Sequence, residues 1–458
     1  MCSAPKTFGS LSVTAKQVIF ALIVAASKLQ TGFVIGWSTV LPKIEADNTT
    51  SFSLTERDIT LLSEISMPGI AGIPGALATG PLIEMMGPKR SLQVLLLLAG
   101  ILWLVQAFTP FRSVLYLGWM CSCLVYTALG PLPAVLITEI SEPRIRGFLL
   151  NTSGVVVALG QLIMSVMAFL LPWDVATAVC AAPITLTAVL TYFVPESPYW
   201  LARQGRKDAA LKSHDRVRTM TETVSLELQT ITSAEGNRQT TMMDQIWRLG
   251  SRQYYLPVLL LAVVFILREL GGQYVVFSYT VYLFRKAGVG LDAFVCTVLV
   301  GVVRLVFTVV GAAVVDRVGR RPLLIATSLV CGAAEVVGAI FLLVDVPGSS
   351  WVPLAAVMIF VSSYGLGIGP IPWALMGELI PTPVRSIGSS VCIMNLSFFS
   401  FVISFVFPYL LEIGLGFALV LFASAHAILT LLLYAFLPET RGRSLSDLEN
   451  VFKPTSGN

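Results

Sequence analysis

Charged residues are scarce in this chain: Asp, Glu, Lys and Arg together make up 12% of its 458 residues. Soluble proteins carry about 25% charged residues, so a globule of this length would have too little polar surface to face water. Hydrophobic residues account for 55% of the sequence. The composition therefore excludes an ordinary soluble protein and predicts a chain whose solvent is the lipid bilayer.

Residues that hold metals or form disulfide frameworks are also few. The chain has two histidines, and six of its seven cysteines lie within apolar runs, where we expect small buried side chains. The sequence contains no Cys–His spacing typical of zinc sites, no Walker loop and no nucleophile elbow. It predicts neither an enzyme nor an ATP-driven pump, and it implies no metal, other cofactor or nucleic-acid partner.

The apolar runs predict an all-α membrane protein. The N-terminal 15 residues lack the charged-then-apolar order of a signal peptide, so we expect the first apolar run to remain as a spanning helix. Crossing a bilayer takes about 20 mostly apolar residues. By this criterion the sequence predicts twelve spans in two sets of six, near residues 17–40, 60–83, 91–108, 114–138, 148–171 and 175–194, and near 255–283, 293–315, 322–344, 352–377, 386–411 and 415–437.

A hydrophilic segment separates the two sets and gives the chain its predicted organisation. Basic and acidic residues alternate through it, which is typical of a solvated connector. We expect an N-terminal segment (1–16), a six-helix bundle (17–194), a linker (195–252), a second six-helix bundle (253–437) and a C-terminal tail (438–458).

Basic residues set the expected orientation. They gather in the loops on one side, at Lys89, Arg146, Arg320 and Arg441 and in the linker. The positive-inside rule makes that side, with both termini, cytoplasmic. The loop over 41–59 would then lie outside the cell, where Asn48-Thr49-Thr50 is a usable glycosylation sequon. We expect a multi-pass protein of the plasma membrane.

The two halves carry the same acidic motifs in the same order, about 240 residues apart. Their acids and arginines sit at predicted cytoplasmic helix ends. Such pairs are costly to desolvate, so each is only marginally favourable and can be broken and remade, as a gate requires. Interfacial anchoring of individual residues is the alternative. Three motifs are paired between the halves. The segment Glu84 to Arg90 corresponds to Asp316 to Arg321, Glu139 with Arg146 corresponds to Glu378 with Arg385, and Glu196 corresponds to Glu439.

These motifs resemble those of the sugar porters. So do Pro195-Glu-Ser-Pro-Tyr-Trp-Leu201, Gly369-Pro-Ile-Pro-Trp373 and Pro438-Glu-Thr-Arg-Gly-Arg-Ser-Leu445, and the resemblance covers nearly the whole chain. Within that family, Gly36-Trp37 and the compact loops look like the facilitated trehalose transporter branch. The resemblance implies a major facilitator fold and an alternating-access carrier for a hexose or a disaccharide.

The resemblance also implies roles for individual residues. Gln161 and Trp373 match positions that contact sugar, and Gly369, Pro370 and Pro372 would break the tenth span and let it bend. The implied cytoplasmic charge network consists of Glu84, Arg90, Glu139, Arg146, Glu196, Asp316, Arg320, Arg321, Glu378, Arg385 and Glu439.

The sequence departs from the family where substrate should bind. The two glutamines usual in the seventh span are replaced by Arg268 and Glu269, an asparagine position holds Tyr274, and Arg304 stands at another asparagine position in the eighth span. Charges inside a span cost about 2.5–3.5 kcal/mol on insertion scales, so they face water or a partner. The candidate substrate contacts are Gln161, Arg268, Glu269, Gln273, Tyr274, Arg304, Trp373 and Asn395.

Three interpretations of these charges stay open. Glu269 could neutralise Arg268 or Arg304, an arginine could hold a carboxylate of an anionic or zwitterionic substrate, or a sugar site could be rebuilt around charged donors. Val34 stands where proton-coupled sugar porters often carry an acid, which favours facilitated transport, and Pro88 replaces a base in the first cytoplasmic motif.

These residues leave three functions open. The first is a facilitative sugar carrier in the lipid bilayer, for which a monomer is plausible. The second is a carrier of a small organic anion or zwitterion, and the third is a non-transporting sensor that keeps the fold.

Overall fold

The computed structural model describes residues 12–46, 62, 71–217, 242–286, 291–344, 351–381, 384–441 and 452. Every regular element within these residues is a helix, and eleven helices are long and apolar enough to cross a membrane. The remaining expected span, near 60–83, is described at residue 62 and from residue 71 onward, where α5 (Gly72–Met86) begins. The all-α membrane architecture is confirmed. Asn48 lies outside the described residues.

The first half of the chain supplies one group of helices. The first span is made of two helices with a turn at residues 27 and 28 between them. The helices of this half are α1 (Val13–Ala26), α2 (Leu29–Trp37), α3 (Leu41–Ala46), α5, α6 (Pro88–Ala107), α7 (Arg112–Leu129), α8 (Leu132–Ile140), α9 (Pro143–Leu170), α10 (Trp173–Val179) and α11 (Ala181–Leu190), followed by a 3₁₀ turn at Thr191–Phe193.

Short helices follow in the hydrophilic segment, and the second half supplies the other group. The described part of the segment holds α12 (Pro198–Arg203), α13 (Lys207–Asp215) and α15 (Met242–Leu249). The second half contains α16 (Arg252–Leu270), α17 (Gln273–Ser278), α18 (Thr280–Lys286), α19 (Ala293–Val318), α20 (Arg320–Val344), α21 (Val352–Ser363), a π-helix (Tyr364–Ile368), α22 (Ile371–Leu379), α23 (Arg385–Ile413) and α24 (Leu415–Phe436).

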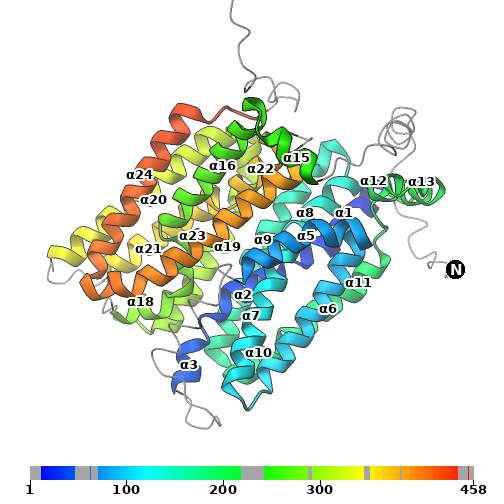
Figure 1. Cartoon of the computed structure of the whole chain (residues 1–458). Helices are drawn as coiled ribbons and strands as arrows, with labels where there is room; N and C mark the ends of the chain where they lie inside the picture. Colours follow the sequence, from blue (N-terminus) through cyan, green and yellow to red (C-terminus); the bar gives the residue numbers. More distant parts are fainter. Residues whose placement is uncertain are drawn as a thin grey trace, which may run out of the picture.

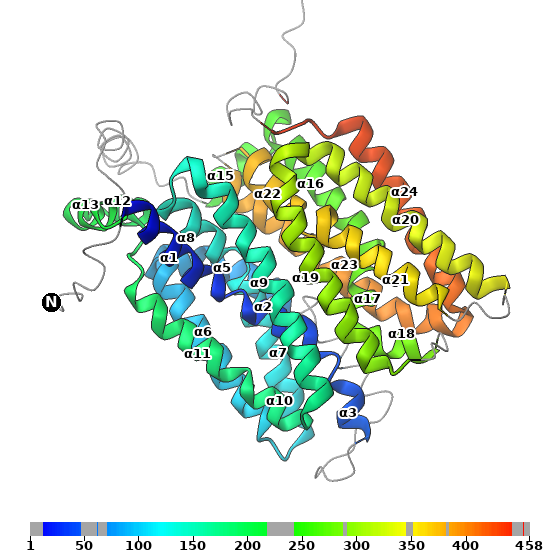
Figure 2. The same ribbon diagram turned by 180° about the vertical axis from the view of Figure 1, so that it is seen from behind.

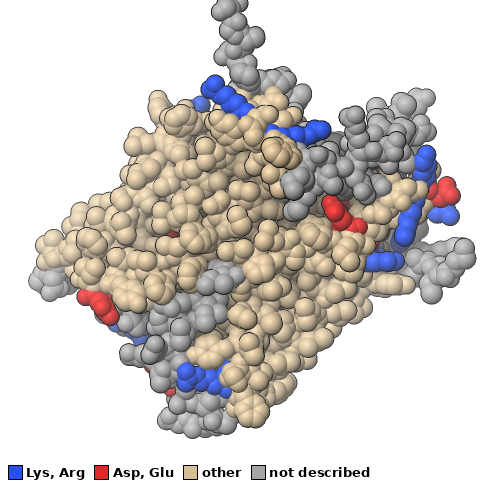
Figure 3. Space-filling view, viewed as in Figure 1, with Lys and Arg blue, Asp and Glu red and all other residues tan. Residues whose placement is uncertain are grey.

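The two groups lie side by side (Figures 1 and 2). They meet where α9 packs on α19 and where α5 packs on α23. Helices α12 and α13 lie at one end of the first group, and α3 lies at the opposite end. Between the two ends the face seen in Figure 3 is almost free of charge. Large apolar side chains such as Leu104, Val306 and Leu431 are exposed on the molecule, as expected for residues that face lipid.

Small residues allow the closest helix contacts inside the first half. Gly32 on α2 faces Gly160 on α9, and a Cβ atom added to Gly32 would lie 2.7 Å from the Cα atom of Gly160. Lipid tails are as apolar as leucine, so helices in a membrane associate through such close packing. This contact fixes α2 against α9, the helix that carries Gln161 to the boundary between the two groups.

Candidate functional site

Two spans of the second half are interrupted, and both interruptions position the candidate site. The run predicted as one helix over 255–283 is divided into α16, α17 and α18, so the prediction of a continuous span was wrong there. Gly272 has a φ angle of 71° at the division, in the left-handed region that disfavours any residue with a Cβ atom. The other interruption is the π-helix Tyr364–Ile368 just before Pro370, where the sequence predicted a break.

Two buried arginines meet at Tyr364. Nη2 of Arg268 donates a hydrogen bond of 2.8 Å to the Tyr364 hydroxyl. Nη1 of Arg304 donates to Oε1 of Gln161 across the boundary between the two helix groups. Both guanidinium groups lie over the Tyr364 ring, at 5.6 Å for Arg268 and 5.3 Å for Arg304, and Arg304 also lies 4.3 Å from the centre of the Phe277 ring. The structure therefore brings three predicted residues, Arg268, Arg304 and Gln161, into one cluster with Tyr364.

Glu269 does not form the ion pair that one interpretation expected. Its carboxylate accepts hydrogen bonds from Nε2 of Gln273 and, at 2.9 Å, from the hydroxyl of Ser400 on α23. Among the described residues, no ion pair joins it to Arg268 or Arg304. The three charged side chains are each no more than 6% exposed. Glu269 and Arg268 still attract each other through space, so mutual neutralisation without a direct salt bridge stays one interpretation.

The arrangement leaves two like charges close together. Because both guanidinium carbons lie near one ring, they are no more than about 11 Å apart. At an effective dielectric constant of about 20, two positive charges at that separation repel by about 1–2 kcal/mol. The aromatic faces of Tyr364 and Phe277 attract both cations and offset part of this cost.

The other three predicted substrate contacts have different neighbours. Tyr274 is buried in α17 within the core that includes residues of the first half. Trp373 is 37% exposed and its ring packs against Phe265 on α16 at 5.4 Å. The side-chain amide of Asn395 donates 2.9 Å to the carbonyl of Val391 on its own helix.

Sequence reasoning missed Tyr364, Phe277 and Ser400. Each lies in an apolar run, where an aromatic ring or a small hydroxyl is expected to be ordinary core. The available signal was the glycine-rich stretch from Gly365 to Gly369, which marks the irregular backbone that places Tyr364 between the arginines.

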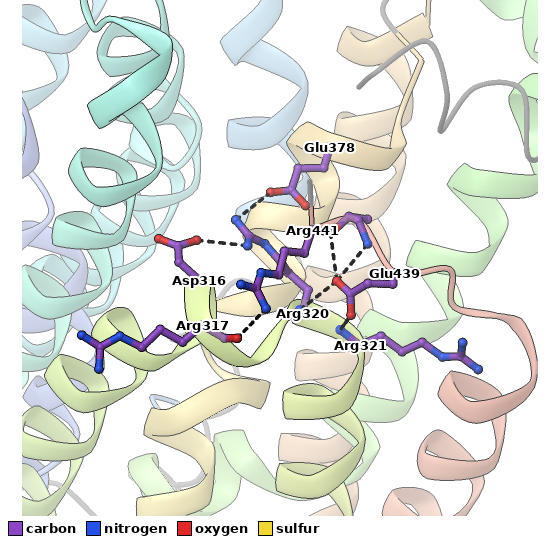
Figure 4. Close-up of polar contacts among 8 residues, drawn as sticks. Asp316, Arg317, Arg320, Arg321, Glu378, Glu439 and Arg441 are labelled. Atoms are coloured by element: carbon purple, nitrogen blue, oxygen red, sulfur yellow. Dashed lines mark hydrogen bonds and ion pairs between the residues drawn. The ribbon is translucent and has the colours of Figure 1, made fainter. Parts of the chain in front are cut away.

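The predicted charge motif of the second half forms a connected network (Figure 4). Nη1 of Arg320 lies 3.0 Å from the Asp316 carboxylate, and Nη2 lies 3.5 Å from that of Glu378 on α22. Glu439 accepts from the backbone N–H groups of Arg320 and Arg321 at 3.1 Å each. Arg320 thus links three segments that follow the eighth, tenth and twelfth spans.

The first half repeats part of this geometry. Gly87 and Gly319 both have positive φ angles, and each faces the carboxylate that follows its half, Glu196 or Glu439. Glu196 accepts 3.0 Å from the backbone N–H of Lys89.

A second feature of the repeat involves tyrosine carbonyls. Nζ of Lys89 donates 2.9 Å to the carbonyl of Tyr192, as Nη2 of Arg321 donates 2.7 Å to that of Tyr434. The internal repeat read from the sequence therefore exists in three dimensions.

Pro88 is where the halves differ. It stands one residue after Gly87, as Arg320 stands after Gly319, and it has neither a backbone N–H nor a side-chain charge. Burial raises the pKa of Glu196, and its two backbone donors, Lys89 and Ser197, do not reverse the shift. Burial also acts on Glu439, but four backbone N–H donors outweigh it and hold its pKa below the ordinary value.

The remaining residues of the predicted network are placed as follows. Glu84 and Arg90 are exposed, and the backbone carbonyl of Glu84 accepts from Nε1 of Trp200 at 3.3 Å. Glu139 lies near the end of α8, and Nη2 of Arg146 on α9 donates 3.4 Å to the carbonyl of Ser141. Arg385 is the first residue of α23.

Comparison with known proteins agrees with this architecture. A family model described as sugar (and other) transporter matches residues 20–452. The chain is 28% identical over 441 residues to sugar transporter ERD6-like 6 of Arabidopsis thaliana, covering 94% of this chain and 89% of that protein. It is 30% identical over 449 residues to facilitated trehalose transporter Tret1 of Culex quinquefasciatus, covering 95% and 86%. It spans about half (51%) of the Tret1 of Drosophila yakuba.

Solved structures show the same fold. The proton:xylose symporter XylE of the major facilitator superfamily, bound to 6-bromo-6-deoxy-D-glucose, superposes with a TM-score of 0.77 at 22% identity, covering 96% of this chain and 100% of that chain. The inward open XylE of E. coli gives a TM-score of 0.73 at 20% identity, covering 95% and 100%. With the family model matched over nearly its whole length, the chain belongs to the sugar (and other) transporter family and is a multi-pass membrane carrier, not an enzyme.

Proposed function

We propose that this protein moves a sugar, a hexose or a trehalose-like disaccharide, across the membrane by facilitated alternating access. The observation that carries the proposal is the family match over residues 20–452, together with relatives named as sugar and trehalose transporters that align over almost the whole chain. Val34 supports facilitated transport over proton coupling, because the first span carries no acid at that position.

The proposed substrate site is the cluster between the two helix groups. The hydrogen bond from Arg304 to Gln161 crosses from one half to the other, so a molecule bound there would contact both halves. The interrupted helices beside the cluster provide places where one half can bend during exchange of access. The proposed contacts are Gln161, Arg268, Glu269, Gln273, Tyr274, Arg304, Trp373 and Asn395.

The proposed gate is the cytoplasmic charge network. In the second half Arg320 is held by two carboxylates that are both partly exposed, so its bonds can be broken at modest cost. The proposed members are those predicted from the sequence, with Glu84, Arg90, Glu139, Arg146, Glu196, Asp316, Arg321, Glu378, Arg385 and Glu439 around Arg320.

The proposed topology follows the distribution of basic residues. Bundles over 17–194 and 253–437 are joined by a cytoplasmic linker over 195–252, with segments 1–16 and 438–458 on the same side. The loop over 41–59 then faces outward with its sequon at Asn48, and the plasma membrane is the proposed location. Treatment of the expressed protein with a glycosidase tests this, because Asn48→Gln should remove any shift in electrophoretic mobility.

Transport in liposomes tests the function. Purified full-length protein should give saturable uptake of radiolabelled glucose or trehalose, unchanged by an imposed pH gradient. Gln161→Ala should reduce uptake because it removes the acceptor of Arg304, whereas Gln204→Ala, an exposed amide on the linker side, should not. Saturable uptake of non-sugars alone would refute sugar transport, and absence of any flux would favour the sensor.

A further inference from the structure

The substrate cluster contains hydrogen-bond donors that nothing in the described part of the chain uses. Arg268 is 4% exposed, and its Nε and Nη1 atoms have no hydrogen-bond partner there. Oε1 of the neighbouring Gln273 is also buried without a partner. Since most buried polar groups in folded proteins are satisfied, unsatisfied donors on a buried cation indicate a place where another molecule binds.

The second arginine also has donors that the described residues do not use. Within the described residues, Arg304 uses only Nη1, which donates to the neutral amide oxygen of Gln161. Its other neighbours are aromatic rings, Phe277 and Tyr364. A guanidinium group presents five N–H donors in a planar fork, so most of this capacity is unused.

The charged side chains described at the cluster are two arginines and one glutamate, so the cluster carries an excess of one positive charge. Glu269 is the acidic side chain at the cluster, and Gln273 and Ser400 already hold its two oxygens. No described carboxylate lies within ion-pair distance of Arg268 or Arg304. A neutral sugar would accept hydrogen bonds from the unused N–H groups of the two arginines. It would leave one of the two positive charges uncompensated in a buried site.

We infer that the substrate is a sugar bearing one anionic group, a carboxylate or a phosphate, which Arg268 and Arg304 bind between the two halves. This inference rests on the proposed sugar transport and specifies its substrate class. The planar fork of arginine matches the paired oxygens of either anion. Oε1 of Gln273, one turn from Glu269, is placed to accept a hydroxyl hydrogen of the sugar.

Binding to the purified full-length protein tests the inference. We would measure affinities for glucose, trehalose, glucuronate, glucose 6-phosphate and lactate by calorimetry. Glucuronate or glucose 6-phosphate should bind about tenfold more tightly than glucose, because a charge-assisted bidentate contact replaces a neutral one. The better of the two identifies carboxylate or phosphate as the anion.

Variants connect the preference to the cluster. Arg268→Gln should remove the roughly tenfold preference for the anionic sugar over glucose. Arg252→Gln is the matched control, since Arg252 is exposed at the start of the same helix. Arg268→Lys keeps the charge but not the fork, so a folded Lys variant with intermediate preference supports the inference even if the Gln variant fails to fold.

The outcomes separate this inference from the proposed function. Uptake of glucose or trehalose, with no preference for either anionic sugar, would overturn the inference and keep the function. Lactate binding as tightly as glucuronate would overturn it as well, because the site would then recognise an anion alone. Absence of uptake for every sugar would overturn the proposed function itself.

Discussion

Gly271→Ala should destabilise the second half because the added methyl group would clash with the imidazole ring of His426, which is buried and held by its neighbours. Gly271 caps α16 with a φ angle of −72°, which alanine adopts without strain. A Cβ atom at this position would lie 2.8 Å from Nδ1 and 2.9 Å from Nε2 of His426. That ring is 1% exposed, lies 2.9 Å from a carboxylate oxygen of Glu335 and packs edge-on against Phe360.

The size of the effect follows from the two ways in which the clash can be relieved. A shift of neighbouring atoms costs about 1–3 kcal/mol, as other overpacking substitutions do. Moving the ring away would instead break its contact with Glu335, and breaking a buried pair costs about 3–5 kcal/mol. The first route is cheaper, so we expect the free energy of unfolding to fall by about 1–3 kcal/mol.

Chemical unfolding in mixed micelles would measure this, as a double-mutant cycle with His426→Ala. Without the ring, the added methyl group has space, so Gly271→Ala should cost at least about 1 kcal/mol less in the His426→Ala background. Gly147→Ala on α9 is the control, because no atom lies within 4 Å of the added Cβ, and it should be neutral or slightly stabilising. An equal cost of Gly271→Ala in both backgrounds would refute the steric argument.

Further predictions concern charge. Because the folded-state pKa of Glu439 is lowered, its contribution to stability is present above the unfolded-state value of about 4.3 and is lost as pH falls through the folded-state value. Glu439→Gln should therefore lower the melting temperature at pH 7 and lose this effect in acid; a pH-independent difference would contradict the reasoning. The pKa of Glu196 is raised, so its protonated carboxyl group contributes stability below about 4.3, and this contribution is lost as pH rises through the folded-state value. Glu196→Gln should be neutral or stabilising at pH 7, and a loss as large as that of Glu439→Gln would show the two sites to be equivalent. Pro88→Arg restores an N–H donor and a guanidinium group, so it should raise the melting temperature and slow uptake; faster uptake would count against a gating role. If the substrate is a carboxylate sugar with one negative charge and is carried alone, an inside-positive potential of about 100 mV should accumulate it roughly fiftyfold in liposomes while glucose stays level. Equal accumulation of the two would exclude net charge movement.

Most of the fold could be predicted because each span must satisfy its own backbone in lipid, which makes apolar length a strong signal. The span expected at 293–315 occurs as Ala293–Val318, and that expected at 415–437 as Leu415–Phe436. The division of the seventh span was missed because Gly271 and Gly272 lie in a run that is apolar enough to read as one helix. Composition reports hydrophobicity, but it does not report that Gly272 is left-handed or that a Cβ atom at this position would clash with the ring of Phe422.

The residues of the candidate site could be predicted from the sequence better than the hydrogen bonds between them. Arg268, Glu269 and Arg304 drew attention because charge is costly inside a span. Which of them are partners depends on the positions of α9, α23 and the π-helix, which no local pattern encodes. Glu269 accepts from Ser400, which is 131 residues away along the chain, and not from the adjacent arginine.

The difference at Pro88 connects these observations at the other end of the molecule. In the second half one residue, Arg320, gives Glu439 a backbone donor and also bridges Asp316 to Glu378. A proline at the corresponding place can do neither. Deeper burial raises the pKa of Glu196, and the smaller number of backbone donors leaves that shift in place, whereas four donors lower the pKa of Glu439. The two halves therefore share a backbone geometry and differ at this position, where the second half has a bridging guanidinium group and the first half has a proline. The bridge that the proposed gate would break at this position belongs to the second half, whose spans also carry both arginines of the proposed substrate cluster.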